Sequence, residues 1–339
     1  MKTLKVVLLC TILTMLFAGC ARRQELGTPE NPYIIRLGHH HNVGSIVDRL
    51  AFEFQRLVHE RSNGRIRVNV FPGAQLGQEN EAAEGVLLGV QQMTIVTPTM
   101  FMDAVEGFGL DSLPFLFSDW DDQWNVFNNS EIGRILDANM VARGARILGW
   151  FTQGGRNMIF VSRNVTRIDQ IRGLRMRSPE SPIYIAMFNA LGASPTPITW
   201  GEAYTAMQTG VVDGMEAPIA ALTDMNFGEV ASYVLMTDHI WGAFALLINE
   251  NFFQTFPPDL QQLILECGAD AVRYAQNASI ESQEAVKQEW TRRGLVFHDL
   301  SPEDRVLLGD LMRPITDQWA TGGPGRRELL DTLQEMRRR

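Results

Sequence analysis

The N-terminal part of the chain alternates between strand-like and helix-like patterns of apolar positions. Short apolar or alternating runs predict strands at 33–38, 65–71 and 93–96. Apolar side chains at helical spacing predict a helix over 45–62, and a second helix is expected over 79–88. The order strand, helix, strand, helix, strand is typical of a parallel α/β unit.

The rest of the chain repeats this pattern and then becomes helical. Further strands are expected at 158–161, 174–176 and 244–248, and helices at 182–191, 201–209 and within 258–294. A body of roughly 310 residues fits two lobes better than one core, because single cores stop growing at about 250–300 residues. We therefore expect two parallel sheets, whose ligands bind where the strands end and helices begin.

The N-terminus has the pattern of a secretory signal. Lys2 and Lys5 precede an apolar run over 6–18, which is too short to span a bilayer. Loss of these lysines leaves 28 of the 30 basic residues against 39 acidic ones, a formal charge of −11. Such a charge argues against nucleic acid as a partner.

Cys20 follows Ala18 and Gly19, which matches the cleavage box of bacterial lipoproteins. Phe17 departs from that box, where leucine is usual. We expect a signal peptide over 1–19, acylation of the Cys20 thiol and a polar tether over 20–32, which would place the protein outside the cytoplasm on a lipid anchor. Secretion without an anchor is the alternative.

Enzyme classes with clear motifs are not indicated. The sequence has no Gly-x-Ser-x-Gly elbow, no phosphate-binding loop and no His-Glu-x-x-His zinc motif. Cys267 lies in an apolar run and is expected to be a buried, unreactive thiol. His39–His41 could suggest a metal, but adjacent side chains point in different directions, so a polar loop is favoured. No cofactor is expected.

Residues 173–218 combine cations, an aromatic residue and turns at short spacings. Arg177 ends a short strand, and Ser178-Pro179 then turns the chain. The guanidinium of Arg177 offers a rigid fork of donors that fits a carboxylate. An ion pair with an acid of the chain is the alternative, and Trp200 belongs either to the same cleft or to the core.

Six segments resemble the extracytoplasmic solute-binding proteins of TRAP transporters, the DctP type. They read LGHHHNVGS, SNGRIRVNVFPGAQLGQENEAAEGVLLG, LDSLPFLF, QIRGLRMRSPESPIY, GASPTPITWGEAYTAMQTGVVDGMEAP and INENFFQTFPPDLQQLI. The resemblance spans 33–336. It implies a two-lobed α/β fold of the type II-like periplasmic-binding-protein kind, with a long helix spanning both lobes. The implied first lobe is 33–153 plus 243–282, and the second is 154–242 plus 283–339.

The resemblance also implies a ligand site. Arg177 matches the family's carboxylate-binding arginine, and Arg156 resembles a second cationic position. Trp200 matches an aromatic residue that packs over the ligand, while His40 and Thr97 match positions in the first lobe. Ala217 stands where many members have an asparagine that bonds the ligand, which disfavours ligands such as sialic acid. Glu216 is expected to form structural hydrogen bonds, and Glu180 to pair with Arg175.

The implied function is capture of an organic carboxylate, such as a C4-dicarboxylate or a sugar acid, and its delivery to the membrane subunits of a TRAP permease. Two alternatives stay open. A lipid-anchored sensor that reports to a receptor would need the same closing cleft. A more apolar acid would be tolerated by Ala217 and Trp200.

Overall fold

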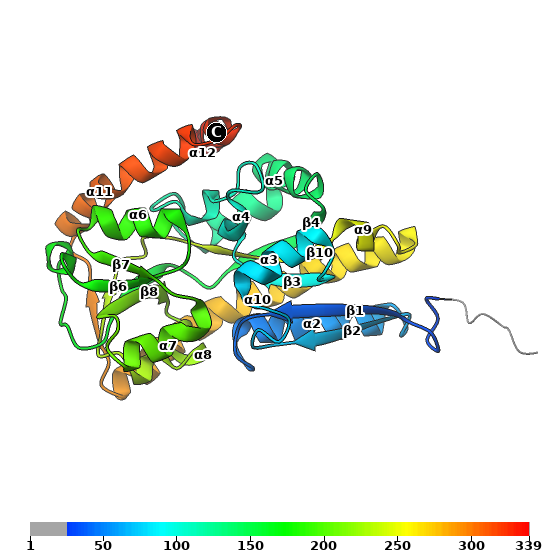
Figure 1. Ribbon diagram of the computed structural model, residues 1–339, viewed down its shortest axis with the longest axis horizontal. Helices are drawn as coiled ribbons and strands as arrows, with labels where there is room; N and C mark the ends of the chain where they lie inside the picture. Colours follow the sequence, from blue (N-terminus) through cyan, green and yellow to red (C-terminus); the bar gives the residue numbers. More distant parts are fainter. Residues whose placement is uncertain (1–25, 339) are drawn as a thin grey trace, which may run out of the picture.

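A computed structural model describes residues 26–338, which form two lobes, each built around one sheet (Figure 1). The first lobe has five strands in the order β2-β1-β3-β10-β4. Their bounds are β1 Tyr33–His39, β2 Ile66–Phe71, β3 Met93–Val96, β4 Ala145–Thr152 and β10 Ala243–Asn249. The expected signal peptide, Cys20 and residues 21–25 of the expected tether lie outside the described residues.

The helices of the first lobe cover this sheet with amphipathic faces. They are α2 Ile46–Arg61, α3 Glu79–Leu88, α4 Trp120–Asn129, α5 Glu131–Val141 and α9 Glu250–Phe253. In α2, Leu50, Phe54 and Val58 are fully buried, and the Ser45 side chain caps the helix by accepting from the backbone N–H of Asp48. The helix predicted over 45–62 is therefore confirmed.

The second lobe has six strands in the order β11-β9-β5-β8-β6-β7. They are β5 Arg156–Phe160, β6 Arg175–Ser178, β7 Ser194–Pro197, β8 Gly214–Pro218, β9 Tyr233–Met236 and β11 Val296–Asp299. The helices α6 Pro182–Ala190, α7 Trp200–Gln208 and α8 Ala221–Asp224 pack around it. Short 3-10 turns occupy Pro98–Phe101, Leu110–Ser112, Ile168–Ile171 and Phe227–Glu229.

The expectation of two purely parallel sheets is wrong. β10 runs antiparallel to β3 and β4, and β5 runs antiparallel to β8 and β9. Both strands are entered directly from the other lobe, through the short links 153–155 and 237–242. A continuous apolar run reports that a strand is buried on both faces but does not report its direction.

One helix, α10 Pro258–Arg292, runs along both lobes (Figure 1). It packs on α2 and β4 of the first lobe and contacts α8 of the second. Near its end, Trp290 is buried in the core of the second lobe and donates from Nε1 to Thr223 Oγ1 over 2.9 Å. Cys267 is fully buried on this helix, as expected. The long helix implied by the resemblance is therefore present.

The C-terminal helices α11 Pro302–Thr321 and α12 Arg326–Arg338 connect the lobes again. α11 packs on α6, whereas α12 packs on α5. Arg337 near the end of α12 donates to Asp122 of the first lobe, with 2.6 Å between Nη2 and Oδ2. Residues 326–338 thus contact the first lobe, although the expected division, which stays a prediction, assigned 283–339 to the second.

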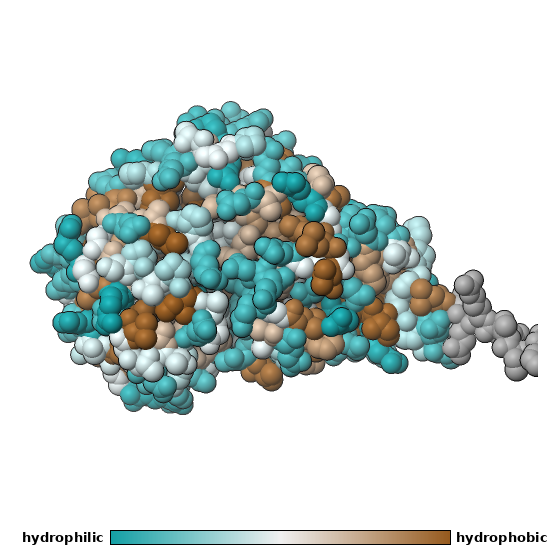
Figure 2. Space-filling view, in the orientation of Figure 1, coloured by the Kyte–Doolittle hydropathy of each residue, from teal (hydrophilic) through white to brown (hydrophobic). Residues whose placement is uncertain are grey.

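Apolar side chains on the face drawn in Figure 2 form small groups between polar ones. Within residues 26–338, no helix combines the length and the apolar character that crossing a membrane requires.

Candidate ligand-binding site

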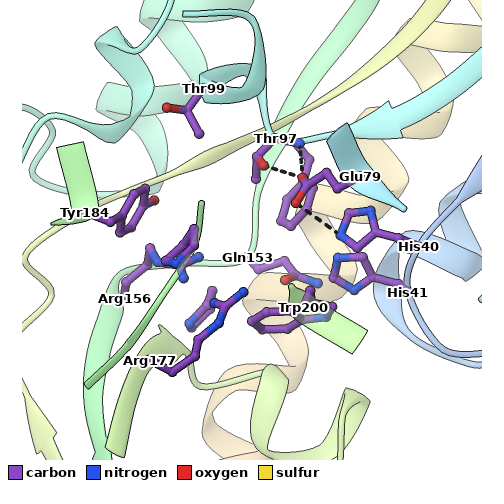
Figure 3. A pocket seen from close by; sticks show the side chains of 13 residues that line it. His40, His41, Glu79, Thr97, Thr99, Gln153, Arg156, Arg177, Tyr184 and Trp200 are labelled. Atoms are coloured by element: carbon purple, nitrogen blue, oxygen red, sulfur yellow. Dashed lines mark hydrogen bonds and ion pairs between the residues drawn. The ribbon is translucent and has the colours of Figure 1, made fainter. Parts of the chain in front are cut away.

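A cavity lies between the two lobes, with about 440 Å³ of empty space when the solvent at its opening is included (Figure 3). The first lobe contributes His40, His41, Glu79, Thr97, Thr99 and Phe244, and the link between the lobes contributes Gln153. The second lobe contributes Arg156, Arg177, Pro179, Tyr184, Trp200 and Pro218. Aromatic walls with a few converging polar groups are typical of small-molecule sites.

Arg177 is a buried cation without a carboxylate partner. It lies within β6, where side chains alternate between the two faces of the sheet. Met176 faces the core, and Arg177 therefore points into the cavity. Only 3% of the residue is exposed, Nε donates to the Ile198 carbonyl over 2.9 Å, and Nη1 has no partner. In the described part of the chain, Arg177 forms no ion pair. Burial lowers the pKa of Arg177 to about 10, so the guanidinium stays charged at neutral pH.

Arg156, by contrast, is paired inside the protein. Neighbouring strands β5 and β8 bring it beside Glu216, which is fully buried. Arg156 donates from Nε and Nη2 to the two carboxylate oxygens, the second over 2.7 Å, and also to the Glu216 carbonyl over 3.1 Å. Burial acts to lower the pKa of Arg156, but Glu216 and Tyr184 hold it above its usual value. The pair leaves this part of the wall with no net charge.

Trp200 joins the cavity to the core of the second lobe. It is the first residue of α7, and Arg177 Cζ lies 5.4 Å from the centre of its ring. On other sides the ring packs on His41 at 5.6 Å and, edge to face, on Phe227 at 5.2 Å. Trp200 therefore satisfies both of the alternatives that the sequence left open.

The wall of the first lobe carries an acid, Glu79, at the start of α3. One of its oxygens, Oε1, accepts from the Thr97 backbone N–H over 2.8 Å and from the Thr97 hydroxyl. The other oxygen, Oε2, lies 3.6 Å from His40 Nε2. Burial lowers the pKa of His40 and, together with its histidine neighbours, that of His41, so both rings are neutral at pH 7.

The comparison with known proteins agrees with this architecture. Residues 37–321 match the family described as bacterial extracellular solute-binding protein, family 7, or DctP. The chain belongs to this family. It is 29% identical over 313 residues to the C4-dicarboxylate-binding periplasmic protein DctP of Rhodobacter capsulatus, covering 91% of this chain and 93% of that protein.

Two solved structures have the same fold. One is a TRAP periplasmic solute binding protein from Desulfovibrio salexigens with bound orotic acid, with a TM-score of 0.84, 25% identity and coverage of 89% of this chain and 98% of that one. The other, from Sulfurospirillum deleyianum with bound succinate, has a TM-score of 0.82, 26% identity and coverage of 89% and 98%. Because DctP-family proteins are solute-binding proteins and not enzymes, the expectation of a non-enzymatic protein is confirmed.

The structure brings together five of the six residues that the DctP resemblance implied. Arg177, Arg156, Trp200, His40 and Thr97 all line the cavity, but Ala217 does not. Side chains alternate along β8, so Ala217 packs into the apolar core of the second lobe, while its neighbour Pro218 faces the cavity. The Thr97 hydroxyl is already engaged by Glu79.

Three expectations about polar residues near the DctP-family site can be compared with the structure. Glu216 forms structural hydrogen bonds, as expected. Glu180 does not pair with Arg175, because Arg175 pairs with Asp213 and Glu180 accepts from Asn80. The expectation that the three histidines diverge holds only for His39, which turns away to Asp48 at 3.1 Å, since the rings of His40 and His41 lie 4.5 Å apart and both line the cavity. Across residues 26–338, no group of three or more histidine, cysteine or acidic residues could hold a metal ion.

Sequence reasoning missed several residues of the site. Glu79, Thr99, Gln153, Tyr184, His41 and Phe244 also line it. Glu79 had a usable signal, because it opens a helix beside the end of a strand, where ligands of α/β sheets bind. Tyr184 and Phe244 had none, because an aromatic residue in an apolar run is indistinguishable from core.

Proposed function

We propose that this protein captures an organic acid by its carboxylate group and delivers it to a TRAP-type permease. The observation that carries the proposal is Arg177, a buried guanidinium with an unpartnered nitrogen that points into the cavity. An unpaired buried charge is costly, and a ligand carboxylate would relieve that cost with two parallel hydrogen bonds.

The ligands of the related proteins also support recognition of a carboxylate. Orotic acid and succinate, the ligands of the Desulfovibrio and Sulfurospirillum proteins, both carry a carboxylate. The Rhodobacter relative is named for binding C4-dicarboxylates. In this chain Arg177 would bind the carboxylate, and Trp200 would pack over the carbon skeleton. Arg156, held by Glu216, would contribute chiefly to the shape of the wall, and His40 and Thr97 would bound the site from the first lobe.

Delivery to a permease requires the protein to work at the outer face of a membrane. The lipoprotein pattern at Cys20 supports an anchor there, with 20–32 as the tether. Two lipid chains or more give stable attachment, whereas one chain is marginal. Expression of the full chain in a bacterial host would test this. We expect the protein in the membrane fraction with a lipid-modified N-terminal cysteine, and Cys20→Ala should prevent both.

A thermal-shift screen of organic acids tests the capture function. A ligand at a hundred times its dissociation constant stabilises a protein by about 2.7 kcal/mol, which is readily measured. We expect stabilisation by at least one carboxylate and none by its amide analogue. Mass spectrometry of the denatured protein should accompany the screen, since a ligand retained through purification would mask the shift. Equal stabilisation by acid and amide would contradict the proposal.

A further inference from the structure

We propose that Glu79 makes this site selective for hydroxylated monocarboxylates, such as aldonic and uronic acids, over dicarboxylates. The inference rests on the proposed function, because it assumes that Arg177 holds one carboxylate of the ligand. It concerns the opposite wall of the cavity, which Glu79 lines from the first lobe (Figure 3).

The first argument is a balance of charge. Arg156 and Glu216 neutralise each other, and His40 and His41 are neutral because burial lowers the pKa of both rings. Arg177 is then the one unpaired cation among the residues that line the cavity. One ligand carboxylate can pair with it directly. A second carboxylate would find no free cation and would lie in the same small cavity as Glu79, where like charges repel strongly.

The second argument is the set of hydrogen-bonding atoms that the ligand must satisfy. Gln153 Nε2 and Trp200 Nε1 are buried donors without a partner. Glu79 offers only acceptors on the opposite wall. A hydroxyl group both donates and accepts, so a hydroxylated ligand can pair with the donors and with the acceptors of the cavity. A dicarboxylate would leave the acceptors unpaired.

Glu79 is held firmly enough to discriminate. As the first residue of α3 it lies at the positive end of a helix, and Thr97 holds one of its oxygens with two donors. The other oxygen is directed toward His40 and the cavity. The aromatic faces of Trp200 and Phe244 then suit the C–H surface of a sugar acid.

Calorimetry with matched pairs of acids tests the inference on the intact protein. Gluconate and glucarate share one carbon chain and differ by the second carboxylate, as do galactonate and galactarate. Glucuronate and succinate complete the set of probes. We expect the best of gluconate, galactonate and glucuronate to bind at least tenfold tighter than succinate and the two aldarates. In Glu79→Gln, which keeps an acceptor for Thr97, that ratio should fall at least tenfold, whereas Glu84→Gln on the exposed face of the same helix should leave it unchanged.

Three results would overturn the inference: a dicarboxylate that binds as tightly as the sugar acids, a ratio unchanged in Glu79→Gln, or no binding of any of the three sugar acids. The proposed function fails separately. If acids without hydroxyl groups bind and require Arg177, carboxylate capture stands and the selectivity does not. If no acid depends on Arg177, carboxylate capture itself is wrong.

Discussion

Two arginines of the cavity have different roles because their partners differ. Arg156 forms an ion pair with Glu216. Arg177 makes one hydrogen bond, to a backbone carbonyl, and keeps an unpartnered nitrogen. A buried pair contributes little net stability, but removing one partner leaves a buried charge uncompensated. The first arginine thus shapes the wall, and the second is available to a ligand.

The variant Glu216→Gln should therefore destabilise the protein by about 3–5 kcal/mol, since Arg156 would stay buried without its partner. Chemical denaturation measures this as a lower free energy of unfolding. Asp213→Asn, which breaks the exposed pair with Arg175, is the matched control and should have little effect. Equal losses in both variants would show that the buried pair has no special role.

Asp111 gives the stability a pH dependence. It is buried on the turn Leu110–Ser112, and burial raises its pKa from 3.8 to about 7. The folded state therefore keeps a proton up to about pH 7 that the unfolded chain releases near pH 4. Asp111 thus lowers the stability as the pH rises through this window.

In Asp111→Asn this loss should disappear. We expect the variant to gain stability relative to the original protein between pH 5 and pH 8, measured as the difference in unfolding free energy at the two values. His239, whose pKa burial lowers to about 3, contributes in the opposite direction in both proteins and cancels in the comparison. A difference that does not change with pH would contradict the buried, protonated state.

At the scale of elements, two glycines leave no room for a Cβ between α10 and β4. A Cβ at Gly268 of the helix would come within 2.5 Å of the Leu148 Cβ, and one at Gly149 of the strand within 2.5 Å of Val272 Cγ2. The helix and the strand are therefore in direct contact at both glycines.

We expect Gly268→Ala to force the helix away from the strand and to cost about 1–3 kcal/mol of stability. Gly309→Ala in α11 is the control, because a Cβ there meets open space and alanine favours the helix by about 1 kcal/mol. Melting temperatures of the two variants should therefore move in opposite directions. A stabilised Gly268→Ala would contradict the packing described.

Elements were the part of the fold that the sequence predicted best. The helices over 45–62 and 79–88 follow from local signals, such as periodicity and capping, that act within a few residues. The direction of β5 and β10 depends on which lobe the chain comes from, and the pairing of Arg156 with Glu216 depends on strand neighbours far apart in sequence. Ala217 faces the core of the second lobe because side chains alternate along β8, a strand that was not predicted from the sequence.

At the scale of the whole molecule, the formal charge of −9 repels anionic ligands. Attraction of an acid must therefore be local, within the cavity. Several hydrogen bonds already join the lobes, among them one from the Ile46 backbone N–H to Asp224 over 3.1 Å. Thr99 and Ser181 lie 3.3 Å apart, and Asn80 donates to Glu180 over 2.9 Å. A ligand that contacts both walls would add to these contacts and so favour closure.

Closure should then depend on the ligand. We expect small-angle scattering to give a smaller radius of gyration when a saturating acid is added, because the lobes close around it. Arg177→Ala at the same acid concentration should not compact. An unchanged radius at saturation in the original protein would count against hinge closure.

Calorimetry of Arg177 variants tests the central claim most directly. With the acid found by thermal shift, Arg177→Ala should bind at least about a hundredfold more weakly, from the loss of a charge-assisted pair worth about 3 kcal/mol or more. Arg177→Lys, which keeps the charge without the fork, should bind with intermediate affinity, and Arg175→Ala on the same strand should bind normally. Unchanged affinity in a folded Arg177→Ala protein would contradict the account.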